Sequence, residues 1–309
     1  MPRRALAAYV FLALVWGLSF MIVLQVVAAF GWAGAITFRA LVAGSTLFTL
    51  ARLTNRKLDF SMGWGKLALL GLFTVAGQLA GIAFAAPLIG TAMTAIIVSA
   101  IPLFSMLIGR ILGLEHLTAA QVAGLAMGLG GIVMLVGFPD APVTPVFLLG
   151  CGVSILGSLS AAIGSLYASE KLKQAGSWEL TIGSFVTGGL MTLPLLWPVP
   201  FNRVPDAADI GWLILLGALT SATCYVVYFK LVNEIGATRA ISVEFAVTVV
   251  AVSAGTFFLG ERLSLLQMAG AAIIISGCAL VLGFNPVRLL KRSRMRTPQP
   301  ELEEKVVNT

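Results

Sequence analysis

The sequence GLEHLTAAQVAG at residues 113–124 returns 146 residues later, at residues 259–270, as LGERLSLLQMAG. In the same register, residues 65–136 align without a gap with residues 211–282, and 18 of the 72 positions are identical. Composition alone would produce roughly six or seven identities over that length. The chain therefore contains an internal repeat.

This repeat lies in a chain of 309 residues that is 59% hydrophobic and 11% charged, with a mean hydropathy of +0.99. A water-soluble domain could not bury so much apolar surface, so we expect lipid to be the solvent of this chain. A helix needs roughly 20 apolar residues to cross a bilayer core. Ten stretches meet this need, near residues 5–29, 33–51, 66–84, 90–109, 119–138, 144–168, 178–197, 209–229, 238–259 and 264–284.

The repeat unit contains five of these spans, which is an odd number. Two copies of a five-helix unit in one chain must therefore enter the membrane from opposite sides. The predicted fold is an all-α integral membrane protein with ten transmembrane helices in two inverted five-helix repeats. We expect the first repeat at residues 1–142, the second at 143–286 and a flexible cytoplasmic tail at 287–309.

The basic residues lie at the ends of the predicted spans rather than in one patch, so the net charge of +7 does not indicate a nucleic-acid partner. Among the basic residues at span ends, Arg203 and Arg262 fall on one side of the membrane and all the others fall on the opposite side. The positive-inside rule then places both termini in the cytoplasm. The bases on that side are Arg3, Arg4, Arg52, Arg56, Lys57, Lys66, Arg110, Lys171, Lys173, Lys230, Arg239, Arg288, Lys291, Arg292, Arg294 and Arg296.

The repeated sequence is expected to form a tight turn between two spans, with Glu115 or Glu261 just before a new helix. A carboxylate in that place meets the positive end of a helix dipole, and Gly124 or Gly270 lets the helix pack closely. We predict a structural role for both glutamates. Because the repeats are inverted, the two turns should face opposite sides of the membrane.

The chain resembles the drug/metabolite transporter superfamily, and within it the ten-helix EamA type, which includes amino-acid and metabolite exporters. The resemblance implies a multi-pass protein of the bacterial inner membrane. One departure is Thr248, which replaces the family's proline in the ninth span and removes the usual cause of a bend there. The residues that carry the resemblance are Trp16-Gly17-Leu18-Ser19-Phe20, Phe38-Arg39, Pro102, the turn from Glu115 to Gly124, and the turn at Leu259-Gly260-Glu261 with Gly270.

In transporters built from inverted repeats, the substrate site lies near the middle of the membrane, between the halves. Polar and aromatic side chains inside the predicted spans are candidates, because an unpartnered polar group costs free energy in lipid. Glu244 is the only acid well inside a span, and Arg39 is the only comparably placed base. The predicted substrate-binding residues are Trp16, Ser19, Gln78, Met93, Ser158, Tyr225 and Glu244.

Each candidate also has a structural interpretation. The amide of Gln78 and the serine hydroxyls could bond neighbouring helices, and Glu244 could be a carboxylate at a helix end. For Arg39 we favour an anchor of the helix bundle over a substrate contact. Tyr228 lies near the predicted cytoplasmic end of its span, so we favour a place at the membrane interface.

The sequence contains no catalytic, nucleotide-binding or metal-binding motif, and its single histidine, His116, falls in a turn. We therefore expect no enzyme activity, no cofactor, no metal and no ATP-driven transport. The predicted function is export of small organic solutes by alternating access. The resemblance implies amino acids as the substrate class, and a mostly apolar cavity would suit those with a neutral or aromatic side chain. The expected partners are the small-molecule substrate and the lipid bilayer, and no oligomer is implied. One alternative is a broad drug or metabolite exporter, and a more remote one is a membrane enzyme or scaffold.

Overall fold

The computed structural model describes residues 3–113, 118–137, 143–235, 240–241 and 243–281. Every regular element among these residues is a helix, which confirms the predicted all-α fold. Glu115 and the predicted tail lie outside the described residues. The elements are α1 (Arg3–Leu53), α2 (Trp64–Gly71), η1 (Leu72–Leu79), α3 (Ala80–Ile89), α4 (Thr91–Val98), α5 (Ile101–Ile111), α6 (Ala119–Gly137), α7 (Pro145–Lys171), α8 (Ser177–Thr192), η2 (Leu193–Leu196), α9 (Ala207–Ile214), η3 (Leu215–Thr223), α10 (Cys224–Ile235), α12 (Val243–Leu259) and α13 (Leu265–Val281).

Helix α1 contains the first two predicted spans, and a break at Gly31 divides them. Gly31 has φ of 66° and ψ of 166°, a conformation that only glycine adopts without strain. Among the described residues, six helices are long and apolar enough to cross a membrane, and α1 counts as one of them. Three shorter apolar helices cover Ala119–Met134, Val243–Leu259 and Leu265–Gly277. The total of ten spans stays a prediction.

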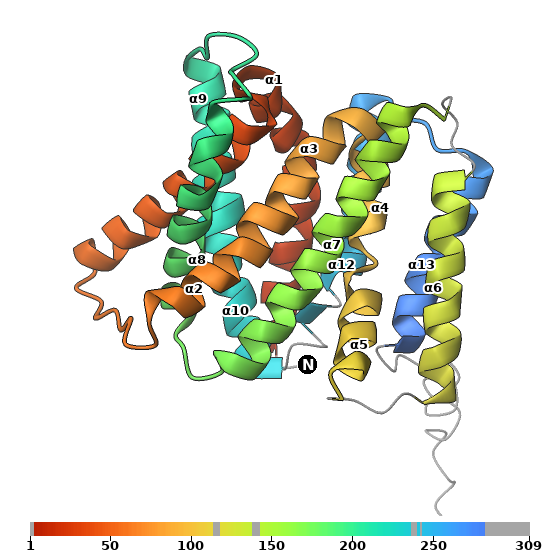
Figure 1. The fold of residues 1–309 in the computed structure, drawn as a ribbon, viewed down its shortest axis with the longest axis horizontal. Helices are drawn as coiled ribbons and strands as arrows, with labels where there is room; N and C mark the ends of the chain where they lie inside the picture. Colours follow the sequence, from red (N-terminus) through yellow and green to blue (C-terminus); the bar gives the residue numbers. More distant parts are fainter. Residues whose placement is uncertain (1–2, 114–117, 138–142, 236–239, 242, 282–309) are drawn as a thin grey trace, which may run out of the picture.

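The helix ends that flank the two matching stretches of sequence lie at opposite ends of the helix bundle. Figure 1 shows the end of α5 and the start of α6 at the same end as the N-terminus, whereas the turn between α12 and α13 lies at the other end. Helix α6 packs along α13, its counterpart in the repeat. The first arm of α1 packs on α12, and α7 packs on α4 and α5, so each half begins with a helix that contacts the other half. These contacts are those expected of inverted repeats.

Two π-helical segments, η1 and η3, occupy overlapping positions in the repeat. In each half a carbonyl of this wide turn accepts a hydrogen bond from another helix. Ser160 Oγ donates to Phe73 O at 2.9 Å, and Trp16 Nε1 donates to Thr220 O at 2.9 Å. Wide turns of this kind frequently mark functional sites in helices.

The fourth and ninth predicted spans differ where Pro102 is matched by Thr248. Helices α4 and α5 are separated at Ser99 and Ala100, just before Pro102 at the start of α5. Proline cannot donate a backbone hydrogen bond and clashes with the preceding turn, which accounts for this break. Helix α12 instead continues through Thr248.

Candidate functional site

Two adjoining cavities lie between the halves and share four lining residues, Trp16, Gln78, Tyr225 and Glu244. The structure thus brings together four side chains from α1, η1, α10 and α12 that the sequence analysis selected separately. The volume that the centres of water-sized molecules can occupy is 40 Å³ in the larger cavity and 20 Å³ in the smaller one. About 10 to 15 Å³ is needed for one water molecule, so this conformation holds only a few waters. That the four residues bind substrate stays a prediction.

Trp16 connects the first helix to the second half of the chain. Its indole nitrogen donates to the carbonyl of Thr220 at 2.9 Å, so the polar atom that lipid could not satisfy has a protein partner. The ring centroid of Trp16 lies 5.4 Å from that of Tyr225 and 5.5 Å from that of Tyr228. Ser19, one turn farther along α1, also lines the larger cavity, and its hydroxyl donates to Trp16 O at 2.7 Å.

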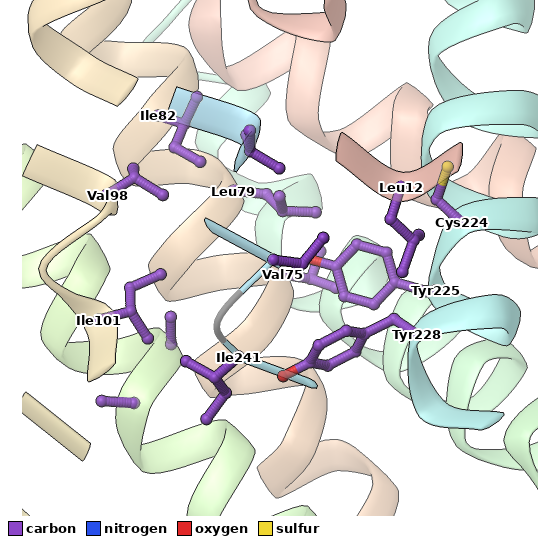
Figure 2. Close-up of a cluster of buried hydrophobic side chains, with 14 of the residues drawn as sticks. Leu12, Val75, Leu79, Ile82, Val98, Ile101, Cys224, Tyr225, Tyr228 and Ile241 are labelled. Carbon is purple, nitrogen blue, oxygen red and sulfur yellow. The ribbon is translucent and has the colours of Figure 1, made fainter. Parts of the chain in front are cut away.

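Both tyrosines of this cluster project from α10 into the core of the bundle. Figure 2 shows their rings side by side, directed toward residues such as Val75 and Ile241 on other segments. Tyr228 is only 8% exposed and lines the smaller cavity. Our expectation of a membrane-interface position for Tyr228 is therefore wrong. Its place near the predicted end of the span suggested an interface, but Tyr228 lies on the inward face of α10 and is buried.

Arg39 belongs to the second arm of α1, the part that follows Gly31, and its side chain lines the larger cavity. The side chain is 5% exposed, and it donates from Nε to Ser221 Oγ at 2.6 Å and from Nη2 to Thr220 Oγ1 at 3.4 Å. These bonds hold α1 against η3, as an anchor would. They leave other N–H groups of the guanidinium without a recorded bond among the described residues, and the same residue lines the cavity.

Glu244 lies in the first turn of α12, is 8% exposed and lines both cavities. Among the described residues, no hydrogen bond or ion pair reaches its carboxylate. The structure places both Glu244 and Arg39 on the larger cavity, with no ion pair between them. The cavity therefore presents one acid and one base that do not neutralise each other by direct contact.

Met93 and Ser158 were predicted to line the site, but the structure places both in helix contacts. Met93 is 2% exposed, and its sulfur accepts from Gln267 Nε2 at 3.6 Å. Ser158 Oγ donates to Ser154 O at 3.0 Å within α7 and reaches Ile97 O of α4 at 3.4 Å. Neither residue lines the two cavities. Helical position alone does not say which inward face points at a cavity and which at another helix.

The carboxylate of Glu261 caps a helix, but not the one that follows it. Its Oε1 accepts from Thr91 N at 2.6 Å and from Thr91 Oγ1 at 2.8 Å, and its Oε2 accepts from Ala92 N at 2.7 Å. These donors form the first turn of α4, so the turn of the second half closes on a helix of the first half. Our expectation that Glu261 would meet the helix just after it is corrected in this respect.

The helices after the two turns are capped by a motif that the sequence analysis missed. Gln121 Oε1 accepts from Thr118 N at 2.9 Å, and Thr118 Oγ1 accepts from Gln121 N at 3.3 Å. Ser264 and Gln267 make the same pair of bonds at 2.9 and 3.1 Å. A Ser or Thr followed three residues later by Gln is a capping box. That signal was present in both copies of the repeated sequence.

The aliphatic residues that line the cavities were also missed, although the repeat contains a signal for them. The 146-residue offset pairs four of them with residues of the second half that line the same cavities. An approximate twofold relation between inverted halves produces this result, because matching positions face each other across the axis. The pairs are Leu79 with Tyr225, Ile82 with Tyr228, Val98 with Glu244, and Ile101 with Val247.

The sequence matches the model of a transporter family and several curated relatives. Residues 4–137 and 148–283 each match the model of the EamA-like transporter family. YedA, an uncharacterized inner membrane transporter of Escherichia coli K12, is 26% identical over 275 residues, which cover 87% of this chain and 88% of YedA. PecM of Dickeya dadantii is 26% identical over 271 residues, covering 86% of this chain and 88% of PecM.

A more distant relative is an uncharacterized transporter of Archaeoglobus fulgidus, 22% identical over 266 residues that cover 86% of this chain and 94% of the relative. One solved crystal structure superposes with a TM-score of 0.65 and 16% identity, covering 95% of this chain and 99% of that chain. At this identity the likeness shows the fold alone.

Proposed function

Because this chain belongs to the EamA-like transporter family, we propose that it is a secondary transporter that exports small organic solutes, with neutral or aromatic amino acids as the favoured class. The single observation that carries the proposal is the cavity between the halves, which holds an acid and a base that are not paired with each other. The solute class rests on the chemistry of this lining.

The charges of the cavity complement a zwitterion. The ammonium group of an amino acid would bind the carboxylate of Glu244, and its carboxylate would bind the free N–H groups of Arg39. Both protein groups are nearly buried, so their interactions with a ligand are weakly screened by water. A substrate that brings both charges would satisfy both groups at once.

The aromatic wall favours a flat or apolar side chain. Trp16, Tyr225 and Tyr228 form a cluster of rings, and Leu79, Ile82 and Val98 line the opposite side. Gln78 adds an amide that can bond either end of the substrate. This mixture supports a neutral or aromatic amino acid over a strongly charged solute, because a third charge would meet no partner.

Transport requires the cavity to open, since its present volume holds only a few waters. Alternating access in inverted repeats comes from one bundle rocking against the other around a central site. The contacts that hold the halves together beside the cavity include the bond of Trp16 to Thr220 and those of Arg39 to Ser221 and Thr220. These bonds join α1 to η3, so we expect this contact to change during the cycle.

The test is counterflow of labelled phenylalanine in proteoliposomes, with competition by phenylalanine, phenylalanine amide and phenethylamine. The amide and the amine keep the ammonium and the ring but lack the carboxylate. Wild-type protein should prefer the zwitterion, and Arg39→Lys should raise the half-saturating concentration of phenylalanine about tenfold while changing that of phenethylamine little. Equal competition by all three compounds would replace this proposal with a broad exporter of amphipathic amines. An imposed pH gradient in the same assay identifies proton coupling.

A further inference from the structure

A polar cleft and an apolar cleft lie next to each other, away from the central cavity. The polar cleft, of 550 Å³, is formed by the segment before α2 and by the connection between α7 and α8 (Figure 1). The apolar cleft, of 590 Å³, lies between the second arm of α1 and α8. Its lining is Phe38, Leu41, Val42, Gly44, Ser45, Phe48, Phe60, Trp64, Ile182, Val186 and Leu213.

The polar cleft contains a buried carboxylate oxygen that has no partner. Glu179 is 6% exposed, and its Oε1 accepts only a long bond from Asp59 N, at 3.4 Å. Its Oε2 is buried and makes no hydrogen bond to any described residue. A buried carboxylate oxygen normally accepts at least one bond, because its desolvation costs free energy that nothing else returns. A ligand in the cleft that carries an N–H or O–H donor would supply the missing partner.

The same cleft offers positive charge for an anion. Lys66, Lys171 and Lys173 line it, and within the described part of the chain only Lys173 forms an ion pair, with Glu170 at 3.2 Å. Lys66 and Lys171 are exposed and free to meet an anionic group. A ligand that fits the cleft therefore carries a cationic group with an N–H donor at one end and an anionic group close to that end.

The two clefts border the same face of α8. Glu179 lines the polar cleft, and Ile182 and Val186 line the apolar one. Ile182 and Val186 follow Glu179 by three and seven residues, so all three lie on one face of the helix over a length of about 10 Å. The segment of residues 59–66 also borders both clefts. Within it the rings of Trp64 and Phe60 are stacked, with their centroids 5.0 Å apart. Tryptophan at such a boundary is typical of the level of lipid headgroups.

We propose that these clefts form one binding site for a glycerophospholipid with a primary amine, such as phosphatidylethanolamine. The ammonium donates to Glu179 Oε2, the phosphate meets Lys66 and Lys171, and an acyl chain lies along Ile182 and Val186. A quaternary ammonium headgroup has no N–H and cannot satisfy Glu179. A free zwitterionic solute would leave the apolar cleft unused.

The test is native mass spectrometry of the full-length protein in detergent with equal amounts of phosphatidylethanolamine and phosphatidylcholine bearing identical acyl chains. Wild-type protein should retain the ethanolamine lipid about tenfold over the choline lipid, the size of one charge-assisted hydrogen bond. Glu179→Gln should bring this ratio close to one. Glu170→Gln is the matched control, because Glu170 lines the same cleft but is exposed and paired with Lys173. Equal retention of both lipids by wild type, or an unchanged ratio in Glu179→Gln, would overturn the proposal.

A second variant separates the lipid from its free headgroup and does not depend on the folding of Glu179→Gln. Ser45 is exposed and lines the apolar cleft, so Ser45→Phe should fill the cleft without disturbing the core. We expect it to reduce retention of the ethanolamine lipid at least fivefold, about the effect of excluding part of one acyl chain. Soluble glycerophosphoethanolamine should not displace the lipid at equal concentration. Full retention in Ser45→Phe, or displacement by the soluble headgroup, would assign the polar cleft to a free solute instead.

Discussion

Leu79, Ile82 and Val98 in the first half are matched by Tyr225, Tyr228 and Glu244 in the second, 146 residues later. All six side chains line the central cavities. Figure 2 shows the aliphatic residues on one side and the two tyrosines on the other. The repeat therefore supplies a symmetric scaffold, while the side chains make one wall apolar and the other polar. Such a cavity can orient a substrate, because at these matched positions only the second half offers polar side chains.

The helices beside these walls differ in the same way. Pro102 accompanies the break between α4 and α5, whereas the hydroxyl of the matching Thr248 donates to Glu244 O at 2.8 Å and to Ala95 O at 3.0 Å. Thr248 thus keeps α12 continuous beneath Glu244 and bonds it to a carbonyl of α4. The rigid helix carries the charged residue, and the broken helix carries Val98.

The largest expected effect is at the charged position of the polar wall. Glu244→Gln should reduce phenylalanine counterflow about a hundredfold, because a charge-assisted bond to the substrate ammonium becomes a bond to a neutral amide. Glu234→Gln, an exposed acid at the end of α10, is the control and should transport normally. Normal counterflow by folded Glu244→Gln would show that the polar wall does not depend on this charge.

The next effect concerns the contact between the halves at Glu261. Glu261→Gln removes charge from three short hydrogen bonds to the first turn of α4 and should lower the free energy of unfolding by about 2 kcal/mol. Unfolding of the purified protein in a denaturing detergent series measures this change, with exposed Glu170→Gln as the control. A variant as stable as wild type would mean that the halves are held together elsewhere.

A smaller effect is expected from the neutral polar groups that face the aliphatic wall. Tyr225→Phe and Gln78→Ala should each raise the half-saturating phenylalanine concentration about three- to tenfold, the range for one neutral hydrogen bond. Tyr167→Phe on α7 lies outside both cavities and should leave saturation unchanged. If neither variant alters saturation, these neutral polar groups serve packing rather than binding.

The smallest effect compares the starts of two matching helices. Helix α9 begins with a capping box in which Asp209 N donates to Asp206 Oδ1 at 2.9 Å, whereas α2 begins at Gly63 without a side-chain cap. The bond from the Asp209 amide, together with the charge of Arg203, lowers the pKa of Asp206 below its ordinary 3.8. The cap is therefore complete at a pH above the ordinary pKa of 3.8, and it is lost as the pH falls through the lowered pKa of Asp206.

Hydrogen exchange measures this difference. Corrected for intrinsic rates, exchange of the first turn of α9 should rise by a fewfold when the pH falls below about 4, whereas that of α2 should not change. Asp206→Ala should show the faster exchange already at pH 7. The same pH response at both helix starts would contradict a role for the carboxylate.

Much of the site could be selected from the sequence, for a physical reason. Trp16, Gln78, Tyr225 and Glu244 carry polar groups inside apolar spans, and such groups must face protein or water rather than lipid. Met93 and Ser158 looked equally suitable, but they meet Gln267 and the α4–α7 contact instead. Periodicity identifies an inward face, but it does not say whether a cavity or another helix lies opposite.

The sequence by itself determined that the chain is helical and membrane-embedded, because apolar segments of this length in lipid must make every backbone hydrogen bond within a helix. It also predicted inverted halves, because the repeat unit contains an odd number of expected spans. Only the tertiary structure decided that Arg39 and Glu244 line one cavity, that Tyr228 is buried, and that Glu261 caps α4, 170 residues away. These contacts depend on how helices from opposite halves cross. The crossing is set by close packing at positions such as Gly77, where an added Cβ would overlap Ser160 of α7.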